Sequence, residues 1–268
     1  MNAGGLTVFD LDSSKVVADI DGVDRATGVL AVAKEHRVYV SAAGRHELIA
    51  FDDQSLALRG RVPGIRFPDG LAYVPDERTI FVSDEAGEAD VAIDAARMVK
   101  LATIGLGGEA GNTHYDSVSH CVLVAVQTRN QLVAIDPAAK RVVARYDIPG
   151  SDGPHGFAID GVYRLAFVTS EGNAKLQVVD LRTMRVLSSH KVGKGPDVVA
   201  WDAASRVLYV ASEAGVVTVF EAVGSELVPL DEVRAPHAHT VSVDPKTHRI
   251  YLPLEKIDGR PVLRVMGF

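Results

Sequence analysis

The sequence predicts an all-β fold, a six-bladed β-propeller with four-stranded antiparallel blades. Three features predict it: a repeat of about 42 residues, short apolar strands between polar turns, and no sustained helical periodicity. A period of roughly 40–45 residues with four strands per unit is typical of propeller blades. The repeat is marked by the residue that ends the first strand of each unit: Ala33, Val74, Asp116, Asp160, Asp202 and Asp244.

The stretch 153–181, GPHGFAIDGVYRLAFVTSEGNAKLQVVDL, shows most of one unit. A turn precedes a first strand over 157–159, and Asp-Gly separates it from a second strand over 164–169. A polar loop then leads to a third strand over 175–179. Strands with tight polar breaks every several residues predict an antiparallel sheet.

The other units repeat this pattern. Third strands end in an apolar-acidic step such as Phe51-Asp52, where the acidic side chain can accept hydrogen bonds from turn amides. Fourth strands are short and β-branched, as over 141–146. The second strands are VYVSA (38–42), IFVSD (80–84), VLVAV (122–126), AFVTS (166–170), LYVAS (208–212) and IYLPL (250–254).

The two ends of the chain predict how the propeller closes. The last unit has strands over 240–243, 249–252 and 262–266 but no fourth strand. We predict that the N-terminal segment Lys15–Ile20 pairs with this C-terminal blade, which would remove an exposed sheet edge. Thr7–Asp10 also resembles a third strand and competes for that place with Val262–Met266. No low-complexity linker interrupts the repeats, so we predict a single domain over 1–268.

Composition excludes several classes of protein. The 28 basic and 35 acidic residues give a formal net charge of −7, and the scattered basic residues argue against nucleic-acid binding. No stretch approaches the ~20 apolar residues that span a bilayer, and the N-terminus has no signal-peptide pattern. We therefore expect a cytoplasmic monomer, or a mature periplasmic or secreted chain whose leader was removed. The single Cys121 is expected to be buried and inert.

The strand sequences YVSA, FVTS and YVAS, with the GPHG and GPD turns, resemble the YVTN/YncE-like β-propeller repeat family. The resemblance covers nearly the whole chain, and the run HTVSVDPKTHRIYLPLE is similar to the last repeat of that family. It implies the fold but no activity, because many members have no assigned reaction. The family borders on gluconolactonases, paraoxonases and virginiamycin B lyase, propeller enzymes that hold a divalent metal at one mouth of the channel.

Polar side chains recur at two positions of the repeat that should lie on one face of the blades. The residues five before each marker are Gly28, Asp69, Gly111, His155, Asp197 and His239, with Asn112 and His237 close by. The residues just after each second strand are Ala43, Glu85, Gln127, Glu171, Glu213 and Glu255. One mouth of the channel is therefore predicted to collect histidines and carboxylates, mostly from units four to six.

Histidine with carboxylate is a usual ligand set for zinc, manganese or iron, and carboxylates with carbonyls suit calcium or magnesium. We predict a divalent metal site formed by His155, His239, Glu171, Glu213 and Glu255. Asp197 and His237 would orient ligands or move protons. Asp69, Glu85, Asn112 and Gln127 would line the substrate channel.

Several interpretations of this pattern stay open. The leading hypothesis is a metal-dependent hydrolase acting on a small lactone or ester. Alternatives are a binding or scaffold propeller without a reaction and, less favoured, a lyase of the virginiamycin B type, which has seven units. The polar residues can also be turn-stabilising or solvated groups. The change of residue type between units favours a site, because a structural turn residue would tend to repeat.

Overall fold

The computed structural model describes residues 5–236 and 238–267. Its strands form antiparallel sheets that follow the repeat, which confirms the predicted six-bladed β-propeller class with four-stranded blades. By contacts the chain divides into two compact units. The first comprises residues up to Tyr115 with His120–Val124 and Val133–Ala144, and the second comprises Asp116–Ser119, Ala125–Leu132 and the chain from Arg145 onward.

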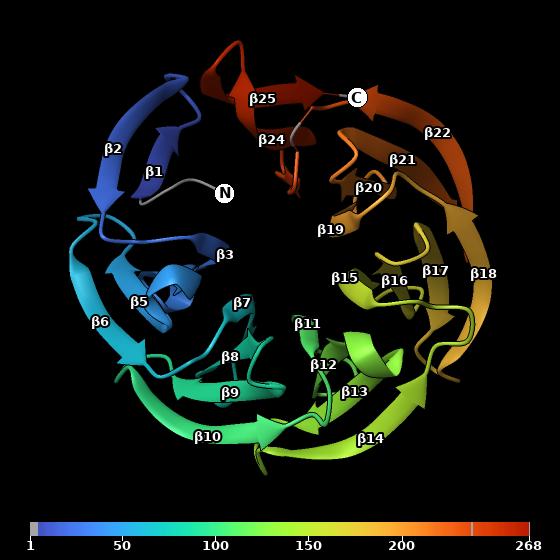
Figure 1. The fold of residues 1–268 in the computed structure, drawn as a ribbon, viewed down its shortest axis with the longest axis horizontal. Helices are drawn as coiled ribbons and strands as arrows, with labels where there is room; N and C mark the ends of the chain where they lie inside the picture. The colour runs from blue at the N-terminus through green and yellow to red at the C-terminus, as the bar shows by residue number, and fades with distance from the viewer. Residues whose placement is uncertain (1–4, 237, 268) are drawn as a thin grey trace. The chain divides into compact units, whose positions relative to one another are not determined.

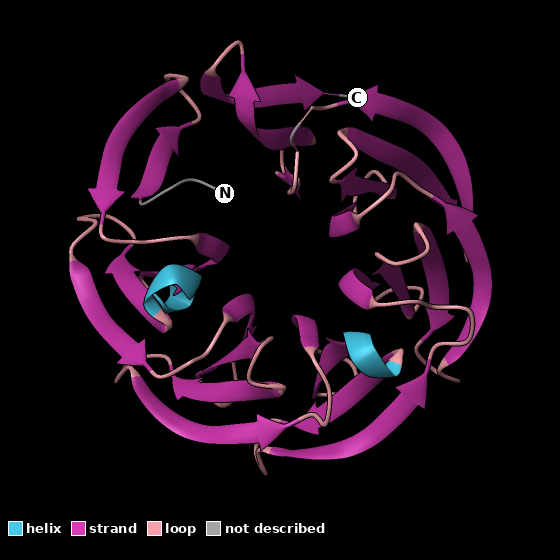
Figure 2. Cartoon of the chain, viewed as in Figure 1, coloured by secondary structure: helices cyan, strands magenta, loops and turns pink. Residues whose placement is uncertain are grey.

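Strands and loops make up nearly all of the described chain (Figure 2). The helical exceptions in the described ranges are three short 3-10 turns: η1 (Ala33–Glu35), η2 (Ala43–Arg45) and η3 (Gln127–Arg129). None of the described helices has the length and apolar character needed to cross a membrane.

The first three blades follow the predicted strand order. Blade 1 contains β3 (Ala26–Val32), β4 (Arg37–Ala42), β5 (Glu47–Asp52) and β6 (Leu58–Pro63). Blade 2 contains β7 (Pro68–Val74), β8 (Thr79–Asp84), β9 (Ala89–Asp94) and β10 (Val99–Gly105). Blade 3 contains β11 (Ala110–Asp116), β12 (Cys121–Val126), β13 (Gln131–Asp136) and β14 (Arg141–Asp147). Cys121 is half-buried, not fully buried as predicted.

Blades 4 and 5 lie in the second unit and carry most of the predicted site. Blade 4 contains β15 (Pro154–Asp160), β16 (Leu165–Ser170), β17 (Lys175–Asp180) and β18 (Arg185–Lys191). Blade 5 contains β19 (Pro196–Asp202), β20 (Val207–Ser212), β21 (Val216–Val223) and β22 (Glu226–Arg234). The first strands of these blades, β15 and β19, lie side by side (Figure 1).

The predicted pairing of the N-terminal strand with the C-terminal blade is not found among the described residues. β2 (Lys15–Asp21) pairs instead with β1 (Gly5–Asp10) in a separate two-stranded sheet. Blade 6 has three strands: β23 (Ser242–Val243), β24 (Arg249–Ile257) and β25 (Arg260–Gly267). Val262–Met266 is therefore the third strand of blade 6, and Thr7–Asp10 belongs to the other sheet.

Burial explains why these sequences form blades. The second strands β8 and β16 are buried at every position, as expected for strands covered on both faces. The fourth strands β14 and β18 alternate between exposed and half-buried residues, because one face meets solvent. In the second unit, Phe167 and Phe220 lie in a core formed by blades 4 and 5, with Trp201 packed against it.

The acidic residues that end third strands stabilise the following turns, as predicted. The Asp52 carboxylate accepts hydrogen bonds from the backbone N–H groups of Gln54 and Ser55. Asp94 and Asp136 accept equivalent bonds, which explains why the apolar-acidic step repeats. These bonds fix the turn into the fourth strand.

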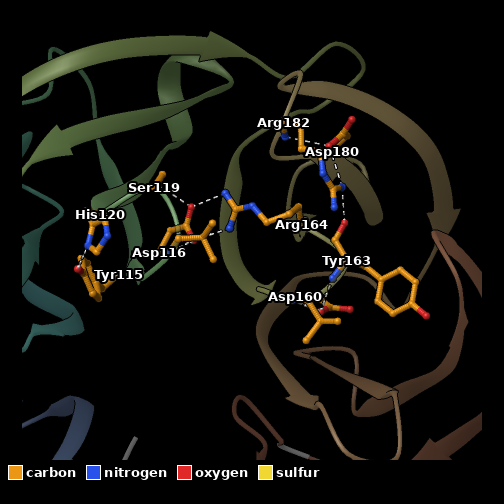
Figure 3. A network of polar contacts seen from close by, with 11 residues as sticks. Tyr115, Asp116, Ser119, His120, Asp160, Tyr163, Arg164, Asp180 and Arg182 are labelled. Carbon is orange, nitrogen blue, oxygen red and sulfur yellow. Dashed lines mark hydrogen bonds and ion pairs between the residues drawn. The ribbon is translucent and has the colours of Figure 1, made fainter.

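A second repeated contact joins residues of the second unit that belong to successive blades. Arg164 donates two hydrogen bonds, of 2.6 and 2.7 Å, to the Asp116 carboxylate at the end of β11 (Figure 3). Arg206, at the equivalent position of the next blade, donates to Asp160 at 3.0 Å. His248 follows, with its Nδ1 2.6 Å from Asp202 Oδ2. The Asp202 side chain is fully buried.

Candidate functional site

The candidate site residues lie at one repeated position of the blades, where the first strand begins to pair with the second. In blades 1, 2, 4 and 5 the first strand begins pairing with the second at an equivalent residue, and a register shift, the mark of a β-bulge, follows. A bulge redirects a side chain out of the regular alternation, and bulges are common beside active sites. The equivalent pairs are Ala26–Ala42, Pro68–Asp84, Pro154–Ser170, Pro196–Ser212 and, as an isolated bridge, Ala238–Leu254.

Candidate residues lie directly after these pairs. His155, Asp197 and His239 follow the first residue of the pair in blades 4, 5 and 6. The residues that follow the second member of the same three pairs are Glu171, Glu213 and Glu255. Blades 4, 5 and 6 therefore each supply one glutamate and one histidine or aspartate.

The turns that precede β15 and β19 hold Glu171 and Glu213 in place. The Glu171 N–H donates to the Gly153 carbonyl at 3.0 Å, and the Glu213 N–H donates to the Gly195 carbonyl at 2.8 Å. Gly195 has a φ of 61°, and a Cβ there would lie 3.1 Å from the Glu213 Cβ. A glycine is required because it adopts this left-handed conformation without strain and lets Glu213 approach.

His155 joins the carboxylates of two blades. Its side chain, 10% exposed, places Nε2 3.3 Å from Asp197 Oδ1 and Nδ1 3.6 Å from Glu171 Oε1. Gly156, the next residue, packs so closely that a Cβ would overlap the Asp197 carbonyl oxygen. This contact brings β15 and β19 together and explains how His155 reaches Asp197.

His239 approaches the same aspartate from the other side. Its Nδ1 lies 3.7 Å from Asp197 Oδ2 and 3.5 Å from Glu213 Oε1, and its Nε2 lies 3.9 Å from Glu255 Oε1. Asp197 is therefore the central residue, with one carboxylate oxygen facing each histidine. All six side chains belong to the second unit.

The two imidazoles control the charge of the central carboxylate. Burial favours the neutral acid, but the attraction of His155 and His239 outweighs it and lowers the pKa of Asp197 to about 2. The Asp197 carboxylate in turn raises the pKa of His239 against the effect of burial, with a smaller contribution from Glu213. Asp197 is thus ionised throughout the neutral range.

These shifts predict a pH window for the contribution of Asp197 to stability. In chelator, we expect Asp197→Asn to cost on the order of 2 kcal/mol between about pH 4 and 6.5. The cost should shrink as pH falls toward the lowered pKa of Asp197, about 2, because the native carboxylate then binds a proton. It should also shrink as pH rises through the raised pKa of His239, because the imidazole loses its charge.

Urea unfolding of both proteins at about pH 3, 5.5 and 8.5 measures this difference. A cost that stayed constant over that range would show that the paired charges contribute nothing to stability.

The structure divides the predicted metal ligands. His155, Glu171 and Asp197 each offer a ligand atom within 4.8 Å of the others, the one such group found among the described residues. Asp197, predicted to act in catalysis, lies within this group. His239, Glu213 and Glu255 contact it through Asp197 or one another without belonging to it. His237, the other predicted catalytic residue, lies outside the described residues.

The predicted channel residues lie in other blades. Asp69 is in β7 and Glu85 follows β8, and the Glu85 N–H donates to the Phe67 carbonyl at 3.0 Å. The Asn112 side chain packs against Gly70, where a Cβ would lie 2.7 Å from its Oδ1. Gln127 begins η3. Their predicted role in a channel stays a prediction.

The pairing of β3 with β4 corrects the repeat position that the sequence assigned in blade 1. β3 ends at Val32, while Ala33 begins η1, so Thr27 and not Gly28 is the counterpart of His155 in blade 1. Thr27 Oγ1 donates a 2.7 Å hydrogen bond to the Pro68 carbonyl. Counting 42 residues back from Val74 would have given Val32 and hence Thr27.

The blades and their strand order define the chain as a β-propeller with a histidine–carboxylate cluster across three consecutive blades. Within that class, the chain belongs to the YNCE-like beta-propeller family, whose sequence pattern matches residues 28–206. No curated protein has a sequence that matches the chain.

Solved structures share the fold at low sequence identity. The RRP9 WD40 repeats align with a TM-score of 0.83 and 9% identity, over 98% of this chain and 88% of theirs. A functionally unknown protein from Desulfotomaculum acetoxidans DSM 771 aligns with a TM-score of 0.77 and 13% identity, over 99% of both chains. The dihydro-heme d1 dehydrogenase NirN aligns with a TM-score of 0.74 and 17% identity, over 98% of this chain and 59% of its own. At these identities the likeness concerns the fold alone.

Proposed function

We propose that this propeller is a metal-dependent hydrolase that acts on a small lactone or ester. One observation carries the proposal: His155, Glu171 and Asp197 offer ligand atoms that all lie within 4.8 Å of one another. One imidazole with two carboxylates is a donor set suited to zinc, manganese or iron.

The chemistry of the three residues fits an ion. The low pKa of Asp197, about 2, keeps its carboxylate deprotonated and able to act as a ligand at neutral pH. The largely buried His155 is held at the β15 bulge, so its ring needs little ordering before it binds. His239 contacts the far oxygen of Asp197 and limits rotation of the carboxylate.

A divalent ion at this point would polarise a lactone or ester carbonyl and lower the pKa of a bound water. His155, Glu171 and Asp197 would hold that ion. Glu213, 62% exposed, and Glu255, 41% exposed, surround the site with negative charge. This charge should favour neutral or cationic substrates over anionic ones.

Metal binding is the first test. We expect protein purified without chelator to contain divalent metal, and added Mn²⁺ or Zn²⁺ to stabilise the chelator-treated protein. At about 100 times the Kd, binding contributes roughly 2.7 kcal/mol, which corresponds to a rise in melting temperature of about 5–10 °C for a chain of this size. His155→Ala should abolish the rise, while Glu232→Gln on the exposed strand β22 should keep it.

Hydrolysis is the second test. A screen of small lactones and esters should find turnover that is lost in chelator, restored by metal and absent from His155→Ala. Metal binding without turnover would instead favour a binding propeller with a structural ion. Absence of both would contradict the proposal and favour a scaffold without a metal.

A further inference from the structure

Asp90 is a buried carboxyl that the proposed metal site does not use. It lies in β9 of blade 2, in the first unit, and its side chain is fully buried. Neither of its carboxyl oxygens has a hydrogen-bond partner within the described ranges of the chain. Buried polar groups are almost always hydrogen-bonded, and an unpaired one is costly, so this exception calls for an explanation.

The other blades place an apolar residue at this position. Asp90 pairs with Ser83 of β8, and the residues in the same register of blades 1, 4 and 5 are Leu48, Leu176 and Val217. All three are fully buried. The fold therefore needs only an apolar side chain here, and a carboxyl that breaks this rule indicates a functional role.

Asp90 faces the joint between blades 2 and 3. Its neighbour Val91 packs against blade 1 in a shared core, and side chains alternate along a strand, so Asp90 points the other way. Thr113 of β11, the first strand of blade 3, lies close enough to affect the pKa of Asp90. Ser83, which pairs with Asp90, accepts a 2.8 Å hydrogen bond from the Gly70 N–H. A Cβ at Gly70 would lie 2.9 Å from the Thr113 nitrogen, so β7 and β11 are in close contact there.

No positive charge compensates an ionised Asp90. Burial raises the pKa of Asp90 to about 7. The Thr113 hydroxyl and two backbone N–H groups lower this pKa in part, and no charged side chain among those the structure describes contributes to it. The strands on either side, β8 and β10, present the uncharged Ser83 and Ile104 at the paired positions. The carboxyl is therefore neutral at acidic pH and becomes an uncompensated buried charge as pH rises past neutrality.

We infer that the joint between blades 2 and 3 is a proton-controlled switch, closed while Asp90 carries a proton and loosened when Asp90 ionises. The neutral acid takes the place of the apolar residue found in other blades. The carboxylate requires water, because an unpaired charge is far costlier to bury than a neutral group, and β9 and β11 must separate to admit it. Asp69 and Asn112, two of the predicted channel residues, adjoin Gly70 and Thr113 in the chain. The switch therefore acts beside the predicted channel, and it does not depend on the metal site, which lies in the second unit.

The pH dependence of stability tests the inference. A carboxyl with a raised native pKa contributes stability that is present below its unfolded pKa, about 3.9, and is lost as pH rises through the native value. The unfolding equilibrium constant of the wild type, divided by that of Asp90→Asn, should therefore rise roughly tenfold per pH unit between about pH 4.5 and 6.5 and level off above about pH 7.5. The control is Asp76→Asn, which removes an exposed carboxyl from the turn after β7 and should show no such rise. Urea unfolding of the full chain in chelator measures these ratios.

Hydrogen exchange locates the effect. At about pH 8, amides of β9 and β11 should exchange faster in the wild type than in Asp90→Asn, and by a larger factor than amides of β20 and β21 in the second unit. An equal factor in all four strands, or no difference at all, would overturn the switch. A stability ratio that does not change with pH would overturn it as well. If Asp90→Asn does not fold, carbon NMR of the wild-type carboxyls decides: a resonance that titrates near neutral pH supports the switch, and its absence overturns it.

Discussion

Gly156→Ala is expected to destabilise the second unit by more than about 3 kcal/mol. The added Cβ would overlap the carbonyl oxygen of Asp197 and would lie 3.2 Å from Thr169 Oγ1. A backbone atom cannot rotate away, so β15 and β19 must separate. Their separation would also pull His155 away from Asp197, so the metal-dependent rise in melting temperature should be lost too.

Gly161→Ala is the matched control, because it makes the same change in the turn after β15. A Cβ at Gly161 meets no atom within 4 Å, so this variant should be neutral or slightly stabilising. Urea unfolding of the wild type, Gly156→Ala and Gly161→Ala measures the difference in their free energies of unfolding. Equal stability of the two variants would show that the close approach of β15 and β19 is not required.

Arg164→Met is expected to cost about 3–5 kcal/mol near neutral pH, because it leaves a buried carboxylate without its cation. The Asp116 side chain is 2% exposed and that of Arg164 is 11% exposed, so water cannot replace the lost bonds. Burial raises the pKa of Asp116, but the bonds from Arg164, Ser119 and the Val118 N–H outweigh burial and lower it overall. Figure 3 shows this network at the joint between blades 3 and 4.

The cost of Arg164→Met should depend on pH in a defined direction. A carboxyl with a lowered native pKa contributes stability above its unfolded pKa, about 3.9, and loses it as pH falls. The difference from wild type should therefore be full near pH 7 and shrink below about pH 4. Arg182→Ala is the control: its side chain is 59% exposed and lies 3.8 Å from Asp180, so it should cost less than about 1 kcal/mol. A pH-independent cost for Arg164→Met would contradict the ion-pair explanation.

The sequence predicted the blades because each strand carries its own signal. Burial on both faces selects runs such as LAFVTS, and the 42-residue interval aligns them without knowledge of their contacts. The site was predicted for the same reason: His155, Asp197 and His239 occupy one repeat position. The pattern fixed which blades contribute but not which atoms face one another.

The parts that could not be predicted depend on contacts between distant segments. Lys15–Ile20 has the composition of a fourth strand, but composition does not choose a partner. A short turn after Asp10 brings β2 onto β1, and closing a short loop costs less entropy than joining two chain ends. The blade joints were not predicted either, because nothing in the sequence shows that Asp116 and Asp202 are buried beside Arg164 and His248.

We propose above all that blades 4 and 5 hold a divalent ion between His155, Glu171 and Asp197. Anomalous diffraction from crystals soaked in Mn²⁺ tests it most directly. We expect a peak about 2.1 Å from His155 Nε2 and from Asp197 Oδ1, the usual length of such metal–ligand bonds. No peak at Asp197 in crystals that bind Mn²⁺ elsewhere would contradict the account.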